Sequence, residues 1–189
     1  GKGAEPRLEN GDIELGAYSL ESTWHAMEQL VELGLVRSIG VANFSTVQLL
    51  DMLSYAKVRP TMNQIELHPY NSQQALVDFC HKHSIAVTAY SPLGNRSRLQ
   101  PGDPVLLEDP VVLTIASQLQ KTPAQVLLRW AIQRQTVVIP KSVTPARITE
   151  NLAVFDFELS ENDMQVLAGL DQGKRFVEPS SAWGVPYFA

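Results

Sequence analysis

The sequence predicts an α/β fold in which four strand-and-helix units follow one another and the strands run parallel. Three observations lead to this prediction. Short apolar runs typical of strands alternate with segments whose apolar residues recur at helical spacing, so helices would connect successive strands. The strand runs are mostly apolar, as parallel strands covered on both faces tend to be. The dinucleotide fingerprint G-x-G-x-x-G is absent, which favours a (β/α) barrel over a doubly wound fold.

The size and composition exclude several classes of protein. The chain has 189 residues and a formal net charge of −5, which fits one domain with a sizeable core and disfavours nucleic acid as the main partner. There is no apolar run of about 18 residues, so we expect no membrane span, and residues 1–11 lack the apolar segment of a signal peptide. Cys80 is the single cysteine, which rules out an internal disulfide and suits the cytoplasm.

The elements can be placed in order along the chain. We expect a loop over residues 1–18, strand-and-helix units over 19–170 and a tail over 171–189. The strands are expected at 36–44, 62–67, 85–90 and 136–139. Residues that commonly cap helices begin the helical segments: Ser19, Ser45, Asn71 or Ser72, Asp109, Thr122, Thr144 and Ser160. Ser45 and Thr122 each have Gln three residues later, which predicts a capping box.

The number of units poses a problem for a complete barrel. Eight units typically need about 250 residues, whereas four are visible here, and four strands leave two open edges. We therefore expect a partial domain, with the first half of the barrel outside this sequence. The segment 92–109 is longer than an ordinary connection, and such loops are often functional.

Polar residues that are candidates for function follow the predicted strands. In a barrel the active site is built at the carboxyl ends of the strands. Asn43 follows the first strand, Gln64 and Glu66 lie on the second, and Tyr90 and Ser91 end the third. Each also has an ordinary structural explanation, since Asn is a common turn residue and a Tyr ring often packs in a core.

The segment 139–151, IPKSVTPARITEN, predicts a phosphate site. It places Lys141 after a strand and opens a helix at Pro145, with Arg147 and Asn151 on one face of that helix. A helix N-terminus offers free N–H groups and a positive dipole end. Lysine adds a point charge and arginine a bidentate fork. The alternative is a solvated cationic turn.

The chain resembles the C-terminal part of the aldo-keto reductase family. Six stretches carry the resemblance in the family's order: GLVRSIGVANFS (34–45), MNQIELHPY (62–70), VTAYSPLG (87–94), PAQVLLRW (123–130), VIPKSVTPARITEN (138–151) and VFDFELS (154–160). The resemblance implies a (β/α)8 TIM barrel of which this chain holds the C-terminal four units and the tail. It also implies reduction of aldehydes or ketones to alcohols with NADPH by the complete protein.

The resemblance assigns the nicotinamide half of the cofactor to the first three strands. Asn43 and Gln64 match positions that hydrogen-bond the nicotinamide carboxamide. Tyr90 matches the aromatic residue that stacks on the nicotinamide ring. Ser91 and Leu93 match contacts to the pyrophosphate region.

The adenosine half is assigned to the last strand and the helix after it. Lys141, Ser142 and Arg147 match the group around the adenosine 2′-phosphate, in agreement with the phosphate site predicted from the helix start. Glu150 and Asn151 match contacts to the adenine.

No catalytic residue and no metal ligand is assigned. The family's tetrad of Asp, Tyr, Lys and His comes from its N-terminal half, and none of those motifs occurs here. Asp51, Tyr55 and Lys57 are of matching types, but they fall on a predicted outer helix. His68-Pro69 resembles part of a tetrad motif but lies within the separate NQIELHP match. We therefore expect the segment alone to be inactive.

The remaining expectations concern substrate and partners. Trp183, between small residues of the aromatic tail, is the candidate for substrate contact, and the substrate is a small carbonyl compound. We expect the complete protein to be cytoplasmic and monomeric. Two alternatives stay open: a noncatalytic nucleotide-binding or regulatory module, and a phosphate-binding barrel enzyme such as an isomerase.

Overall fold

The computed structural model describes residues 6–11, 13–14, 16–180 and 187–188 of the chain. Four strands form one sheet in the order β1-β2-β3-β4, and every pair is parallel. The strands are β1 (Val41–Ala42), β2 (Met62–Glu66), β3 (Ala86–Tyr90) and β4 (Val137–Val138). The predicted α/β fold with four parallel strands and alternating helices is confirmed.

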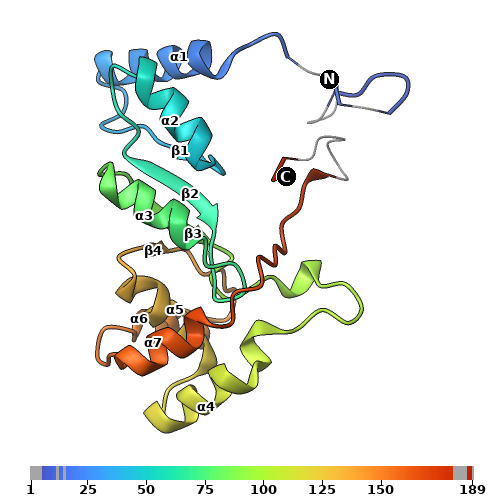
Figure 1. Cartoon of the computed structure of the whole chain (residues 1–189), viewed down its shortest axis with the longest axis vertical. Helices are drawn as coiled ribbons and strands as arrows, with labels where there is room; N and C mark the ends of the chain where they lie inside the picture. Colours follow the sequence, from blue (N-terminus) through green and yellow to red (C-terminus); the bar gives the residue numbers. More distant parts are fainter. Residues whose placement is uncertain (1–5, 12, 15, 181–186, 189) are drawn as a thin grey trace.

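Seven α-helices and two short 3-10 turns are found in the described residues. The helices are α1 (Leu20–Glu32), α2 (Thr46–Tyr55), α3 (Gln74–Lys82), α4 (Pro110–Leu119), α5 (Pro123–Gln133), α6 (Pro145–Leu152) and α7 (Glu161–Ala168), and the turns are η1 (Arg96–Arg98) and η2 (Leu106–Glu108). Along the long axis of the molecule α1 and α2 lie at one end, the strands in the middle and α4 at the other end (Figure 1). None of these helices is long and apolar enough to cross a bilayer.

The outer strands are shorter than the sequence predicted. β1 covers two residues of the expected 36–44, and β4 covers two of the expected 136–139. Each of these strands has a hydrogen-bonding neighbour on one side only among the described residues. A strand is assigned only where its backbone pairs with a neighbouring strand. The other apolar residues of the predicted runs are not paired in this way, so they lie outside β1 and β4. The inner strands β2 and β3 pair over their full five residues.

Local capping determines where most helices begin. The Ser45 side chain accepts the Gln48 N–H at 3.3 Å while the Gln48 side chain accepts the Ser45 N–H at 2.9 Å, and Thr122 with Gln125 forms the same box. Ser19, Asp109 and Ser160 also cap as predicted.

The predicted cap of α3 is wrong. The N-cap is Gln73, which has left-handed φ of 45° and makes no side-chain cap bond. Asn71 instead donates to the Glu66 carbonyl, and Ser72 donates to Asp171 of the C-terminal segment. Both side chains are drawn away from the helix because tertiary partners lie within reach.

The core lies between the sheet and the helices. Leu49, Ile65, Val87, Leu127 and Trp130 are at most 2% exposed and belong to one apolar cluster. Burying each such side chain contributes roughly 1.5–3 kcal/mol. Successive residues of a strand point to opposite faces of the sheet. Because Ile65 points into this cluster, its neighbours Gln64 and Glu66 on β2 point to the other face.

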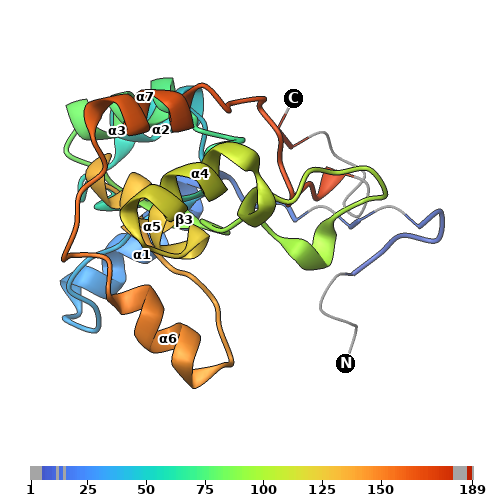
Figure 2. The same ribbon diagram turned by 90° about the horizontal axis from the view of Figure 1, so that it is seen from below.

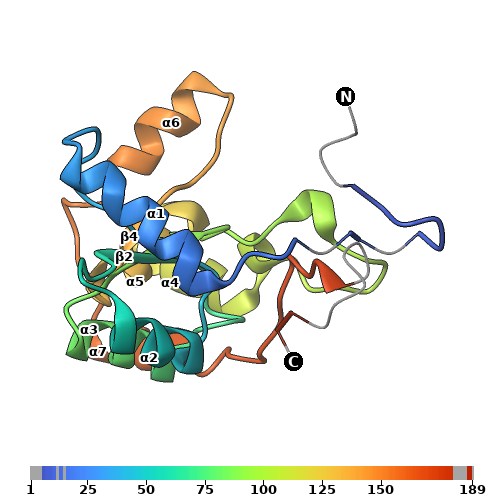
Figure 3. The same cartoon turned by 90° about the horizontal axis from the view of Figure 1, so that it is seen from above.

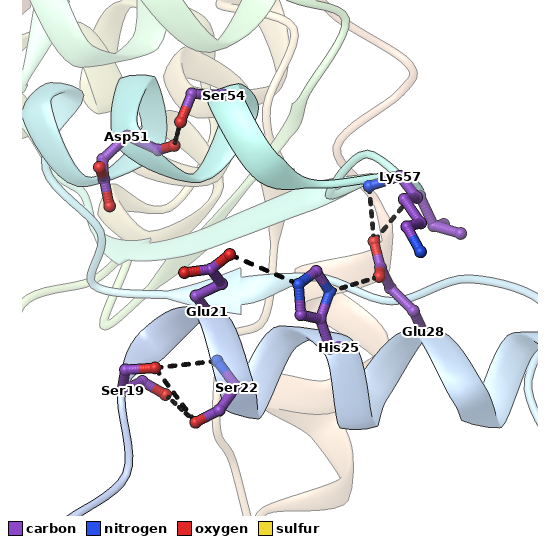
Figure 4. Close-up of polar contacts among 9 residues, drawn as sticks. Ser19, Glu21, Ser22, His25, Glu28, Asp51, Ser54 and Lys57 are labelled. Carbon is purple, nitrogen blue, oxygen red and sulfur yellow. Dashed lines mark hydrogen bonds and ion pairs between the residues drawn. The ribbon is translucent and has the colours of Figure 1, made fainter.

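A buried carboxylate joins α1 to the connection that leads into β2. Glu28 Oε1 accepts the backbone N–H groups of Lys57 at 2.7 Å and Val58 at 2.8 Å, and its Oε2 contacts His25 Nδ1 at 2.9 Å (Figure 4). These bonds hold the connection between α2 and β2 against α1. They lie away from the carboxyl ends of the strands.

Two segments extend from the sheet on one side. The loop 92–109 and residues 171–180 lie beside each other in two views (Figures 1 and 2), and the Lys174 ammonium joins them by contacting Asp103 Oδ1 at 2.5 Å. Helix α6 lies at the periphery of the molecule (Figure 3), where it packs against α5. The space bordered by the loop, α5 and α6 holds most of the predicted site.

Candidate functional site

Asn43 lies directly after β1 with a left-handed φ of 60°, a conformation that Asn tolerates better than most residues. Its N–H donates to the Gln64 carbonyl on β2 at 2.8 Å. Its side-chain Oδ1 is buried and has no hydrogen-bond partner in the structure. Buried polar atoms are normally paired, so this oxygen is an acceptor left unsatisfied in the structure. The structure thus places Asn43 next to Gln64 on the neighbouring strand.

Tyr90 ends β3 and lies opposite Glu66 in the register. Its hydroxyl is buried and also has no hydrogen-bond partner in the structure. Burial, reinforced by the charge of Glu66, raises the pKa of Tyr90 to about 12. The hydroxyl therefore stays protonated at neutral pH, and the half-buried ring presents an uncharged aromatic surface.

A tight turn after Tyr90 opens the loop. Ser91 has φ of 49°, and its carbonyl accepts the N–H of Gly94 at 2.9 Å. Gly94 has φ of 73°, and a Cβ there would come within 3.2 Å of the Phe176 ring. Both conditions favour glycine. The turn directs Leu93 toward the cavity beside the loop.

A cavity of about 750 Å³ lies between the loop after β3, the start of α5 and the segment before α6. Seven of the ten predicted cofactor residues line it: Ser91, Leu93, Lys141, Ser142, Arg147, Glu150 and Asn151. The other three, Asn43, Gln64 and Tyr90, are not in its lining, and Asn43 borders a second cavity of about 490 Å³. The cavity has the volume of a small-molecule site.

The α6 side of the cavity is suited to an anion. Thr144 is the N-cap of α6 but makes no side-chain cap bond, and Pro145 follows it, so the next N–H groups are uncapped. Lys141 and Arg147 are exposed, and neither has an ion-pair partner in the described part of the chain. Two unpaired cations at a helix N-terminus attract phosphate.

Glu150 lines the cavity and is held by residues at the start of α5. Its Oε1 accepts the Thr122 hydroxyl at 2.7 Å, and its carbonyl accepts the Gln125 amide at 3.3 Å. Asn151 follows it in the cavity lining. The two bonds fix α6 relative to α5, which positions Arg147 on α6.

The comparison with protein families agrees with this geometry. The model of the aldo/keto reductase family matches residues 6–172. The chain belongs to the aldo/keto reductase family.

Individual reductases give the same result. The chain is 48% identical over 184 residues to aldo-keto reductase family 1 member A1-A of Danio rerio, covering 95% of this chain and 57% of that relative. It is 49% identical over 189 residues to the probable NAD(P)H-dependent D-xylose reductase xyl1 of Emericella nidulans, covering 96% of this chain and 59% of that relative. The chain therefore spans a little more than half the length of these reductases.

Sequence reasoning did not find the role of Glu66. Its carboxylate is fully buried at the end of β2, and Oε1 accepts the Phe176 N–H at 2.7 Å while Oε2 accepts the Val177 N–H at 3.1 Å. His68 Nε2 lies 3.0 Å from Oε1. A carboxylate at the end of a predicted strand was the only signal, because its backbone partners lie 110 and 111 residues later.

The other residue types considered from the sequence do not join the cavity. Asp51 and Tyr55 lie on α2 and Lys57 just after it, none of them in the lining, consistent with the predicted outer helix (Figure 4). Among the described residues no group of His, Cys, Asp and Glu is arranged to hold a metal ion. Trp183, the predicted substrate contact, lies outside the described residues.

Proposed function

We propose that the complete protein reduces aldehydes or ketones to alcohols with NADPH, and that this chain supplies most of the cofactor site as the C-terminal four units of a (β/α)8 barrel. The observation that carries the proposal is the 750 Å³ cavity, in which the uncapped start of α6 meets Lys141 and Arg147. Membership of the aldo/keto reductase family supports the reaction type.

The residues at the ends of β1 and β3 fit the nicotinamide half of NADPH. NADPH, when bound, supplies the hydride. The buried Asn43 oxygen without a partner is suited to accept a carboxamide N–H, and the neighbouring Gln64 offers both a donor and an acceptor. The uncharged Tyr90 ring offers a flat surface for stacking. These residues bind and orient the ring.

The residues around α6 fit the adenosine half. Lys141 and Arg147 are exposed cations with no competing ion pair in the described chain, so they are suited to the 2′-phosphate that distinguishes NADPH from NADH. Ser142 and Leu93 line the same cavity, as do Glu150 and Asn151. We infer a preference for NADPH over NADH.

Nucleotide titration of the chain and its Arg147→Ala variant tests this function. Loss of a charged hydrogen bond costs about 1.5–3 kcal/mol, so we expect binding of NADP⁺ to weaken by roughly 10- to 150-fold while binding of NAD⁺ changes little. Arg37→Ala is the control, because Arg37 is also exposed but precedes β1, at the opposite edge of the sheet. Equal losses for NADP⁺ and NAD⁺ would make Arg147 a structural residue.

The substrate is proposed to be an aromatic or lipid-like carbonyl compound that contacts the tail. Glu66 holds the backbone of Phe176 and Val177 beside the end of β2, which anchors the described part of the tail next to that strand. In the complete protein, Trp183→Ala is expected to change kcat/KM unequally across a panel of aldehydes, with less effect on NADPH affinity. A uniform loss across the panel, or reduced thermal stability with unaltered selectivity, would assign Trp183 to packing.

A further inference from the structure

A third cation, Arg96, lines the same cavity from the side opposite α6. It begins the turn η1 in the loop after β3, three residues beyond Leu93. It is not among the site residues predicted from the sequence. Its guanidinium forms an ion pair with Glu108, which lies in η2 at the other end of the loop.

This ion pair is easily exchanged. Both side chains are 62% exposed, and exposed ion pairs contribute only about 0–1 kcal/mol to stability. A phosphate offers Arg96 a stronger partner, because a guanidinium binds phosphate oxygens through two parallel charge-assisted hydrogen bonds.

The loop that carries Arg96 is fixed at its base. Gly94 packs close to the Phe176 ring, and Leu106 is buried in the core. Lys174 pairs with Asp103 in the middle of the loop. The backbone of the loop therefore has anchors on both sides of η1, and a change of partner by Arg96 needs movement of a side chain only.

We propose that Arg96 is a phosphate-binding residue of this site, which leaves Glu108 and pairs with the pyrophosphate of a bound dinucleotide. The inference rests on the proposed function, because it takes the residues before the loop as the pyrophosphate side of the cavity and α6 as the 2′-phosphate side. Glu108 competes with the ligand for the guanidinium, so it lowers the affinity for dinucleotides.

Three probes separate the two phosphate positions in titrations of the 189-residue chain. NADP⁺ carries the pyrophosphate and the 2′-phosphate, NAD⁺ the pyrophosphate alone, and 2′-AMP the 2′-phosphate alone. Arg96→Ala is expected to weaken NADP⁺ and NAD⁺ by a similar factor of roughly 10, the lower end for a charged hydrogen bond, and to leave 2′-AMP unchanged. Arg147→Ala is expected to weaken binding of NADP⁺ and 2′-AMP and to leave binding of NAD⁺ unchanged. Arg98→Ala is the matched control, since Arg98 lies exposed on the same turn but outside the cavity lining.

The Glu108→Gln variant supplies a result in the opposite direction. Removing the competitor is expected to tighten NADP⁺ and NAD⁺ binding by up to about fivefold, the value of an exposed ion pair. In the double variant Arg96→Ala/Glu108→Gln this tighter binding is expected to disappear, because Glu108 affects the ligand only by competing for Arg96.

The possible failures are distinguishable. If the wild-type chain binds NADP⁺ and NAD⁺ and Arg96→Ala leaves both affinities unchanged, the role of Arg96 is refuted and the cofactor site stands. If Glu108→Gln weakens binding in parallel with Arg96→Ala, the ion pair orders the loop and exchange is refuted. If the wild-type chain shows a native circular dichroism spectrum and binds none of the three probes, the proposed cofactor site fails, and the inference fails with it.

Discussion

Replacing Glu66 with Gln is expected to detach the C-terminal segment from the sheet. The carboxylate accepts two backbone N–H groups, at 2.7 and 3.1 Å, in a fully buried site. Gln has one acceptor oxygen, and its NH2 group would face the second backbone donor, so one buried N–H is left without a partner. An unsatisfied buried group costs about 1–3 kcal/mol, and the surviving bond loses its charge assistance. We expect the free energy of unfolding to fall by about 2–4 kcal/mol, the sum of the unsatisfied N–H and the lost charge assistance.

Two measurements check this expectation. Urea denaturation gives the change in free energy of unfolding, and hydrogen exchange locates it. The amides of Phe176 and Val177 should lose protection in Glu66→Gln. The amides of Gln172 and Lys174 donate to the Tyr70 carbonyl at 3.1 and 2.9 Å, so they serve as internal controls. A destabilisation below about 1 kcal/mol, with Phe176 and Val177 still protected, would refute the role of Glu66 as the anchor.

Three other predictions concern separate parts of the molecule. The hydrogen bond from the Val58 N–H, and contact with His25, lower the pKa of Glu28 below its usual 4.5. The stability that Glu28 contributes is therefore complete above about pH 4.5 and is lost as the pH falls through the lowered pKa of the folded state. Glu28→Gln should lack this loss of stability in acid, and an acid-unfolding profile equal to that of the wild type would contradict the prediction. Gly40→Ala should lower the free energy of unfolding by about 1–3 kcal/mol, because a Cβ would lie 2.8 Å from the Met62 carbonyl oxygen. An unchanged melting temperature would count against this close approach of the two backbone segments. The 189-residue chain alone should show no steady NADPH consumption with an aromatic aldehyde, and the opposing result would be turnover that is abolished by a Tyr90 substitution.

Much of the local structure was predictable from the sequence. The capping boxes at Ser45 and Thr122 formed as predicted, because both bonds of a box join residues three apart and need no distant partner. The parallel order of the strands followed from the helices between them, since a strand that returns through a helical crossover runs in the same direction. The helix start at Pro145, between Lys141 and Arg147, was also predictable, because it lies within one short segment; the phosphate site stays a prediction.

Other features needed the tertiary structure. The length of β1 depends on which residues meet β2, so hydropathy alone overestimated it. Asn71 and Ser72 did not cap α3 because a carbonyl at position 66 and a carboxylate at position 171 were closer partners.

The composition of the site also depended on folding. Lys141 and Arg147 share a cavity with Arg96 only because the parallel sheet brings the ends of β3 and β4 to one edge. Glu66 serves as an anchor only because the chain returns to it after 110 residues. The sequence by itself determined the local caps, the strand order and the chemistry available in each segment, since these depend on neighbouring residues. The tertiary structure decided which of those groups meet, because a long-range contact depends on the packing of every element between its partners.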